Sequence, residues 1–196
     1  MVPTVRKPAI FLREAGLPHR IVPVDLSQKR TDDFLALNPN GKIPVLVDEE
    51  QGVTLFESAA ILQYLAERSG RFLPSDGPRR AEVLQWLAWQ AAAVSPAVEQ
   101  LGHFLFRDEK LPYPIDRFAD MCVRYMRVLD VQLTHRAFVT DEYSIADIGL
   151  FPFVKVLWAP LREIRPDQVA DFGHIEGWLQ RVGERPAVLA VQKELA

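Results

Sequence analysis

Cysteine is almost absent from this sequence, in which Cys122 is the single example. One cysteine excludes an intramolecular disulfide and a Cys-x-x-Cys redox pair, and it is typical of a reducing compartment, so we expect a cytoplasmic location. Cys122 lies in an apolar helical segment, which predicts a buried, inert thiol and not a nucleophile. His19, His135 and His174 lack the spacing of a metal site, so no metal is expected.

Long hydrophobic runs and blocks of one charge are also missing. No apolar run approaches the roughly 20 residues that a membrane-spanning helix needs, and Met1–Lys7 lacks the apolar centre of a signal peptide. The 23 basic and 26 acidic residues give a net charge of −3 without a basic cluster, so neither a membrane nor a nucleic acid is expected as partner. With 48% apolar and 25% charged residues, the composition is that of an ordinary globular protein.

The first part of the chain mixes helical and strand-like patterns. Helices are expected at 8–15, 31–37 and 58–68, and strands at 21–24, 45–47 and 53–56. The last two strands look like a hairpin, because a glycine-containing turn separates them. Pro23 gives the strand at 21–24 an edge position, since proline cannot donate to a sheet.

The second part of the chain carries helical periodicity alone. It follows Leu73–Pro78, a proline- and glycine-rich segment that is the predicted linker. Expected helices cover 79–106, 115–133, 144–158, 175–182 and 187–194. Pro96 is expected to kink the first of them near Ala92. We therefore predict a mixed α/β domain at residues 1–74 and an all-helical domain at residues 79–196.

A capping signal marks the start of the helix at 144–158. Ser144 and Asp147 have the spacing of a capping box, and Tyr143 with Ile148 has the spacing of a hydrophobic staple. The pattern predicts a folding signal without a catalytic role.

A lysine–isoleucine–proline element precedes the strand at 45–47. The peptide bond between Ile43 and Pro44 is a candidate for the cis form, although proline also simply opens edge strands. In the cis case, the backbone N–H and C=O of Ile43 would turn outward and could pair with an extended peptide ligand.

The residues Leu55-Phe56-Glu57-Ser58 lie where a strand ends and a helix begins. Ser58 is a good helix N-cap, which is the simpler interpretation. Alternatively, the free N–H groups of the helix and the Ser58 hydroxyl could hold a carboxylate, with Glu57 taking an ammonium group. That arrangement suits the head group of an α-amino acid, and the residues alone leave both interpretations open.

The sequence resembles the cytosolic glutathione transferases, which carry three such elements in the same order and spacing: Lys42-Ile43-Pro44, Leu55-Phe56-Glu57-Ser58 and Ser144-Ile145-Ala146-Asp147. The segments 35–42 and 111–117 look closest to the Nu-class branch of bacteria and fungi, which is known for glutathione-dependent disulfide reduction and peroxidase activity. The resemblance implies an α/β thioredoxin-like N-terminal domain, an all-α C-terminal domain and a homodimer. It also implies a glutathione transferase that uses bound glutathione as co-substrate against a small electrophile, peroxide or disulfide.

The resemblance further implies which residues form the site. Ile43, beside a cis Pro44, would pair with the cysteinyl backbone of glutathione, and Glu57 with Ser58 would hold the γ-glutamyl end. The implied glutathione-binding residues are Asn40, Lys42, Ile43, Pro44, Glu57, Ser58 and Arg124. The residues implied to line the second-substrate site are His103, Phe104 and Tyr113.

The N-terminus departs from the family pattern, which has a strand followed by a stretch resembling T-P-N-G-R/H-K. Here Arg6 and Lys7 match that stretch, which aligns Val2 with the threonine and Thr4 with the asparagine and leaves almost no room for the first strand. Either the natural start lies upstream, or the protein has diverged and lacks the usual catalytic residue. Thr4 is the predicted thiolate stabiliser, because a hydroxyl at a helix N-terminus can lower the pKa of a thiol. The alternative is a non-catalytic binding or scaffold protein with the same fold.

Overall fold

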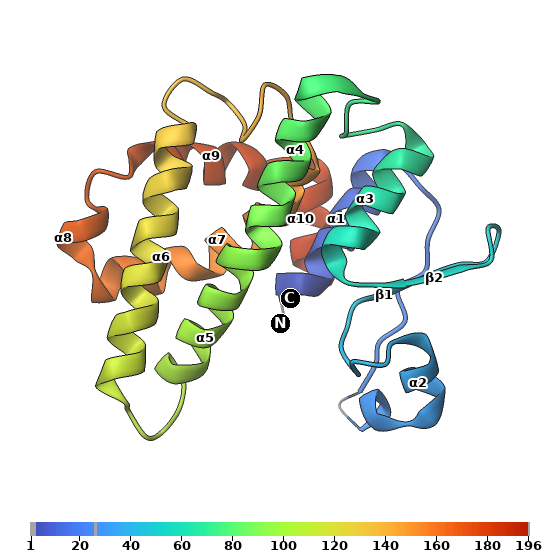
Figure 1. The fold of residues 1–196 in the computed structure, drawn as a ribbon, viewed down its shortest axis with the longest axis horizontal. Helices are drawn as coiled ribbons and strands as arrows, with labels where there is room; N and C mark the ends of the chain where they lie inside the picture. The colour runs from blue at the N-terminus through green and yellow to red at the C-terminus, as the bar shows by residue number, and fades with distance from the viewer. Residues whose placement is uncertain (1–2, 26, 196) are drawn as a thin grey trace.

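A computed structural model describes residues 3–25 and 27–195 of the protein. Its N-terminal part carries a small two-stranded sheet beside short helices (Figure 1). The elements of this part are α1 (Pro3–Ala15), η1 (Gln28–Arg30), α2 (Asp32–Leu37), β1 (Val45–Asp48), β2 (Val53–Phe56) and α3 (Ser58–Ser69).

The remainder of the described chain is helical, which confirms the predicted change from mixed to all-helical structure (Figure 1). Its elements are α4 (Gly77–Trp89), η2 (Gln90–Val94), α5 (Ser95–Leu105), α6 (Pro112–Gln132), α7 (Ile145–Ile164), α8 (Pro166–Val169), α9 (Gly173–Gly183) and α10 (Pro186–Glu194). Across the described residues, no helix has both the length and the apolar character needed to cross a membrane.

The predicted hairpin is confirmed. Strands β1 and β2 pair antiparallel, from Val45 opposite Phe56 to Asp48 opposite Val53. The buried Asp48 carboxylate accepts a hydrogen bond of 2.8 Å from the Tyr64 hydroxyl on α3 and forms an ion pair with Arg68. Helix α3 is therefore held against the hairpin that precedes it.

The strand predicted at 21–24 is wrong, since these residues adopt no regular structure. Ile21 and Val22 are exposed, Val22 by 62%. A strand needs a partner for its backbone groups, and the described strands, β1 and β2, pair only with each other. Helix α1 begins at Pro3, five residues earlier than predicted, and it runs through Pro8.

The predicted irregularity near Ala92 is confirmed. The expected helix 79–106 consists of α4 and α5 with a π-helical turn, η2, between them. Pro96 in the first turn of α5 has no N–H to give to the carbonyl four residues earlier, and a π turn absorbs such a defect. The turn points the Gln90 side chain inward, where it is fully buried.

Helix α7 forms the centre of the core, and α1, α3, α4 and α9 pack on it. Gly149 allows the close approach of α4, because a side chain there would lie 3.1 Å from Leu87. The N-terminal part shares this core through edge-to-face contacts of Phe72 with Phe11 and with Tyr143, at 5.5 and 5.7 Å between ring centres.

The capping box at the start of α7 is confirmed. The fully buried Asp147 carboxylate accepts hydrogen bonds from the Val139 and Ser144 backbones and from the Trp178 indole, at 2.9, 3.0 and 2.9 Å. Burial raises the pKa of Asp147 to about 6, while these donors act in the opposite direction. One side chain thus joins the start of α7, the segment before it and α9.

We predict that Asp147→Ala destabilises the protein by about 3 kcal/mol or more, because it leaves several buried donors without an acceptor. Asp171→Ala, which removes an exposed carboxylate, is the matched control and should stay within about 0.5 kcal/mol of the parent. Chemical denaturation followed by circular dichroism measures both. A loss below 1 kcal/mol for Asp147→Ala would contradict the structural role of this carboxylate.

Candidate functional site

The peptide bond between Ile43 and Pro44 is cis, as the sequence suggested. The turn before it is built by Asn38, whose side chain accepts from the Asn40 N–H at 2.9 Å and donates to the Lys42 carbonyl at 2.6 Å. Asn40 and Lys42 are exposed on this turn, and Ile43 is half-buried. Among the described residues, the backbone of Ile43 has no hydrogen-bond partner, so it is available to a ligand.

Glu57 makes the sharp turn from β2 into α3. Its φ of +67° is a left-handed value that residues other than glycine rarely adopt, and such strain gathers at functional sites. The Glu57 side chain is exposed, and its carbonyl accepts the first bond of α3, from the Ile61 N–H at 3.0 Å. The N–H groups of the residues in between are therefore free of intrahelical partners and form an anion-binding helix start.

The interpretation of Ser58 as an N-cap is wrong, because α3 begins at Ser58 itself and Glu57 occupies the cap position without a side-chain bond. A tight turn with positive φ at Glu57 moves the cap back by one residue. The Ser58 hydroxyl instead accepts a hydrogen bond of 3.2 Å from the ammonium group of Lys7. Ser58 is 5% exposed.

Lys7 is the site residue that the sequence analysis missed. It is 1% exposed, and its ammonium donates to Gln90 Oε1 at 2.9 Å as well as to Ser58. The ring of Phe153 lies 4.5 Å from the same nitrogen. The sequence did carry a signal for Lys7, because this residue belongs to the segment that matched the family pattern. A lysine near the start of a helix is nevertheless normally expected to be exposed.

Burial governs the charge of Lys7. It lowers the pKa of Lys7 to about 7, and the more distant carboxylates of Glu99 and Glu57 act in the opposite direction. A buried cation without a carboxylate in hydrogen-bond contact favours the arrival of an anion. The start of α3 therefore combines free N–H groups, a hydroxyl and a positive charge behind it.

Thr4 lies in the first turn of α1 and is half-buried. It precedes Lys7 by three residues, so both side chains lie on neighbouring positions of one helical face. Val2, the other residue aligned with the family pattern, lies outside the described residues.

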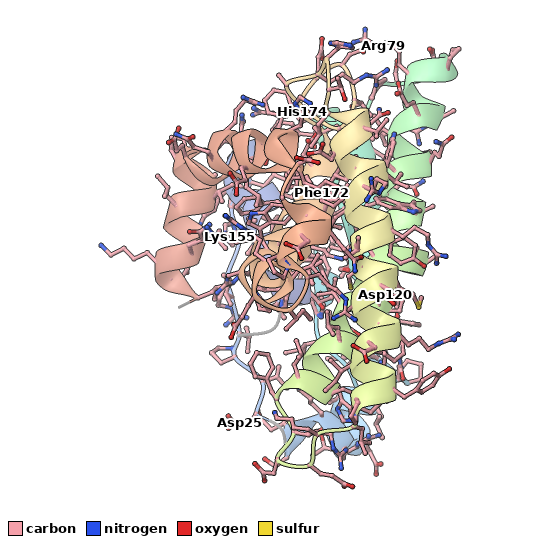
Figure 2. The ribbon with its side chains drawn as sticks, turned by 90° about the vertical axis from the view of Figure 1, so that its left-hand side faces the viewer. Asp25, Arg79, Asp120, Lys155, Phe172 and His174 are labelled. Carbon is pink, nitrogen blue, oxygen red and sulfur yellow. The ribbon has the colours of Figure 1, made fainter. Side chains whose placement is uncertain are left out.

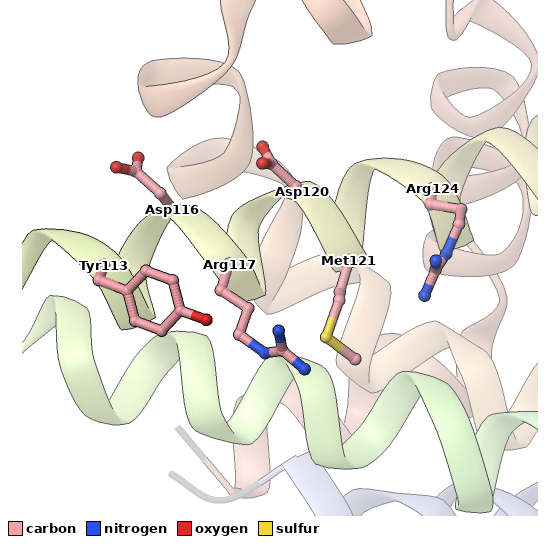
Figure 3. A pocket seen from close by; sticks show the side chains of 6 residues that line it. All are labelled: Tyr113, Asp116, Arg117, Asp120, Met121 and Arg124. Atoms are coloured by element: carbon pink, nitrogen blue, oxygen red, sulfur yellow. The ribbon is translucent and has the colours of Figure 1, made fainter.

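Arg124 and Tyr113 line a shallow depression of about 530 Å³ along α6. Figure 3 shows Tyr113, Arg117, Met121 and Arg124 on one side of the helix, with Asp116 and Asp120 pointing the other way. The two aspartates are held by Arg165, at 2.7 and 3.0 Å. Arg117 and Arg124 therefore face the depression without these two carboxylates beside them.

His103 and Phe104 lie together on α5, with 5.1 Å between their ring centres. Phe104 also stacks on Phe118 of α6, and Arg107 donates to His103 Nε2 at 3.2 Å. No ring contact joins Tyr113 to this cluster in the part of the chain that is described. The three residues expected at a second-substrate site therefore occupy two features, the aromatic cluster and the α6 depression.

The predicted burial of Cys122 is confirmed, since it is fully buried and burial raises the pKa of its thiol to about 12. Such a thiol does not form the thiolate that a nucleophile needs. Among residues 3–25 and 27–195, no cluster of three or more histidine, cysteine or carboxylate side chains could hold a metal ion.

Curated proteins with similar sequences include two disulfide-bond oxidoreductases of Escherichia coli K12. YfcG is 37% identical over 194 residues, which cover 94% of this chain and 88% of YfcG. YghU is 39% identical over 161 residues, which cover 79% of this chain and 56% of YghU.

Solved structures with the same fold include two glutathione transferases of Pseudomonas. The protein from Pseudomonas putida, with one glutathione disulfide bound per subunit, superposes with a TM-score of 0.91 at 35% identity, over 98% of this chain and 87% of that one. The protein from Pseudomonas fluorescens, with two glutathione molecules bound, gives 0.90 at 32% identity, over 97% and 88%.

Family models match both halves of the chain. The N-terminal domain of glutathione S-transferases matches residues 3–68, and the C-terminal domain matches residues 112–181. The N-terminal part is therefore a thioredoxin-like domain, although its described residues form a sheet of two strands. The chain belongs to the glutathione S-transferase family.

Proposed function

We propose that this protein is a glutathione-dependent transferase that reduces disulfides, with the γ-glutamyl head of glutathione bound at the start of α3. The observation that carries the proposal is the start of α3 at Glu57 and Ser58, whose first N–H groups lack intrahelical partners, with a buried lysine behind it. Relatives named as disulfide-bond oxidoreductases and similar structures with bound glutathione support it.

Each end of glutathione has a chemically matched group. The α-carboxylate accepts from the N–H groups of α3 and from the Ser58 hydroxyl, and the exposed carboxylate of Glu57 takes the α-ammonium. The cysteinyl backbone pairs with the free N–H and C=O of Ile43, beside Pro44, as in strand addition. Asn40 and Lys42, exposed on the adjacent turn, contact the remaining polar groups of the tripeptide.

The nucleophile is the sulfur of glutathione, since Cys122 is buried and inert. A bound glutathione thiolate attacks one sulfur of a disulfide, forms a mixed disulfide and releases the other sulfur as a thiolate that takes up a proton. A second glutathione thiolate then attacks the mixed disulfide and leaves glutathione disulfide and a second free thiol. The protein orients the reactants and stabilises the thiolate.

Thr4 is the proposed thiolate stabiliser, through a hydroxyl in the first turn of α1. The aromatic cluster of His103 and Phe104 is the proposed contact for the second substrate, and Tyr113 and Arg124 extend it along α6. Arg124 supplies a positive charge that suits a carboxylate of a second glutathione or of a glutathionylated substrate.

A homodimer in the cytoplasm is the proposed assembly and location. Its support is apolar surface on two elements, since Val128 and Val131 are exposed on α6 and Val47 and Phe56 on the hairpin. Sedimentation of the 22.3 kDa chain should give about twice that mass, and a monomer at micromolar concentration would contradict the dimer. The division into domains at Leu73–Pro78 stays a prediction.

Ser58→Ala tests the head-group site. It removes a donor to the ligand carboxylate, so we expect glutathione to bind about 10- to 100-fold more weakly by calorimetry. Ser75→Ala, at an exposed serine of the linker, is the control and should bind as the parent does. Equal affinity for the parent and Ser58→Ala would remove Ser58 from the site.

Thr4→Ala tests the thiolate stabiliser and separates an enzyme from a binding protein. We expect glutathione to bind within a few fold of the parent, while reduction of 2-hydroxyethyl disulfide slows by about 10-fold or more and Thr4→Ser restores it. The ultraviolet absorbance of the bound thiolate should fall in parallel. If the parent binds glutathione but turns over no disulfide or peroxide, the non-catalytic alternative holds.

A further inference from the structure

A series of buried, hydrogen-bonded side chains runs from the thioredoxin-like domain to the helical domain directly behind the proposed ligand site. Lys7 of α1 donates to Ser58 of α3 and to Gln90 of η2, and Gln90 in turn donates to Ser95 at the start of α5. Phe153 of α7 lies against the ammonium group. Lys7, Ser58 and Gln90 are each less than one-tenth exposed, so the series is a built feature of the core.

We propose that Lys7 is a positioning residue that aims the Ser58 hydroxyl at the ligand carboxylate and supplies the buried positive charge of the site. The inference rests on the proposed function, because it takes the γ-glutamyl carboxylate of glutathione as the anion at the start of α3. Lys7 acts through Ser58 and has no contact with the ligand.

The hydrogen bond from Lys7 decides where the Ser58 hydroxyl points. A serine hydroxyl has one hydrogen to donate, and Lys7 in its charged form can only donate to the serine oxygen. The Ser58 hydrogen therefore points away from Lys7, and since the hydroxyl donates to no acceptor among the described residues, this hydrogen is free for the carboxylate. Hydroxyl and helix N–H groups then converge on one anion.

Gln90 holds Lys7 in this position. Its amide NH₂ donates to Ser95, which leaves the amide oxygen facing Lys7 at 2.9 Å. The π-helical turn puts this side chain in the core, so the geometry of the glutathione site depends on an irregular turn in the other domain. Such turns are frequent at functional sites.

The charge on Lys7 should follow occupancy of the site. The ionisable groups that act on it are Glu57 at the start of α3 and Glu99 on α5, while η2 contributes the amide of Gln90 and α7 the ring of Phe153. Burial lowers the pKa of Lys7 to about 7, so much of it is neutral in the empty site slightly above that pH. A bound carboxylate favours the ammonium form, and binding then takes up a proton.

Calorimetry with S-methylglutathione at pH 8, in buffers of different ionisation enthalpy, tests the inference. This ligand has no thiol, so proton release from sulfur does not enter the measurement. We expect the parent protein to take up about 0.5 to 1 proton per site. Lys7→Met should remove most of this uptake and weaken binding by about 10- to 100-fold.

Two further variants serve as a control and as a second test. Lys155→Met removes an exposed lysine on α7 (Figure 2) and should bind and take up protons as the parent does. Gln90→Glu places a carboxylate beside Lys7 and keeps it charged in the empty site, so binding should proceed with little proton uptake. This variant keeps the inference testable if Lys7→Met does not fold.

The outcomes separate the two proposals. If the parent binds S-methylglutathione and neither the affinity nor the proton uptake changes in Lys7→Met and Gln90→Glu, Lys7 has no positioning role and the proposed function stands. If the parent does not bind S-methylglutathione at all, the proposed function falls and the role of Lys7 falls with it.

Discussion

The hydrogen bond between Lys7 and Ser58 is the contact on which the site depends. Lys7 is buried, which lowers its pKa to about 7, and the Gln90 amide and the face of Phe153 are the further partners of its ammonium form. These partners leave the ammonium short of negative charge, which an incoming carboxylate supplies. The same contact joins α1 to the start of α3, so stability and binding are linked at one point.

The remainder of the fold fixes α1, α3 and α7, which meet around Lys7 and Ser58. Helix α7 is buried along most of its length, and its start is held by Asp147, so it offers a rigid surface to α1 and α3. The hairpin is held to α3 through Asp48 and Tyr64, and its register sets Val45 opposite Phe56, so the residues around Ile43 and the start of α3 adjoin the same end of the hairpin. The extended backbone at Ile43 matches the peptide groups of a γ-linked tripeptide, and the start of α3 matches its charged head group.

Local chemistry made much of this predictable. The hairpin and the capping box follow from residues that act within a few positions of one another, and the Ile43–Pro44 pair made a cis bond one of two interpretations. The prediction of a strand at 21–24 was wrong because a strand forms only when it pairs with another strand, and that partner cannot be inferred from the segment itself. The role of Lys7 was missed for a related reason. Its burial depends on Gln90, which lies 83 residues away and points inward because of a π-helical turn.

The central claim is that glutathione lies alongside Ile43 with its head group at the start of α3. Titration of the ¹⁵N-labelled protein with glutathione, followed through backbone amide shifts, tests this most directly. The account predicts that the amides of Ile43, Ser58 and Ala59 shift together and saturate with one affinity. Shifts confined to the α6 depression, with these three amides unmoved at saturation, would contradict it.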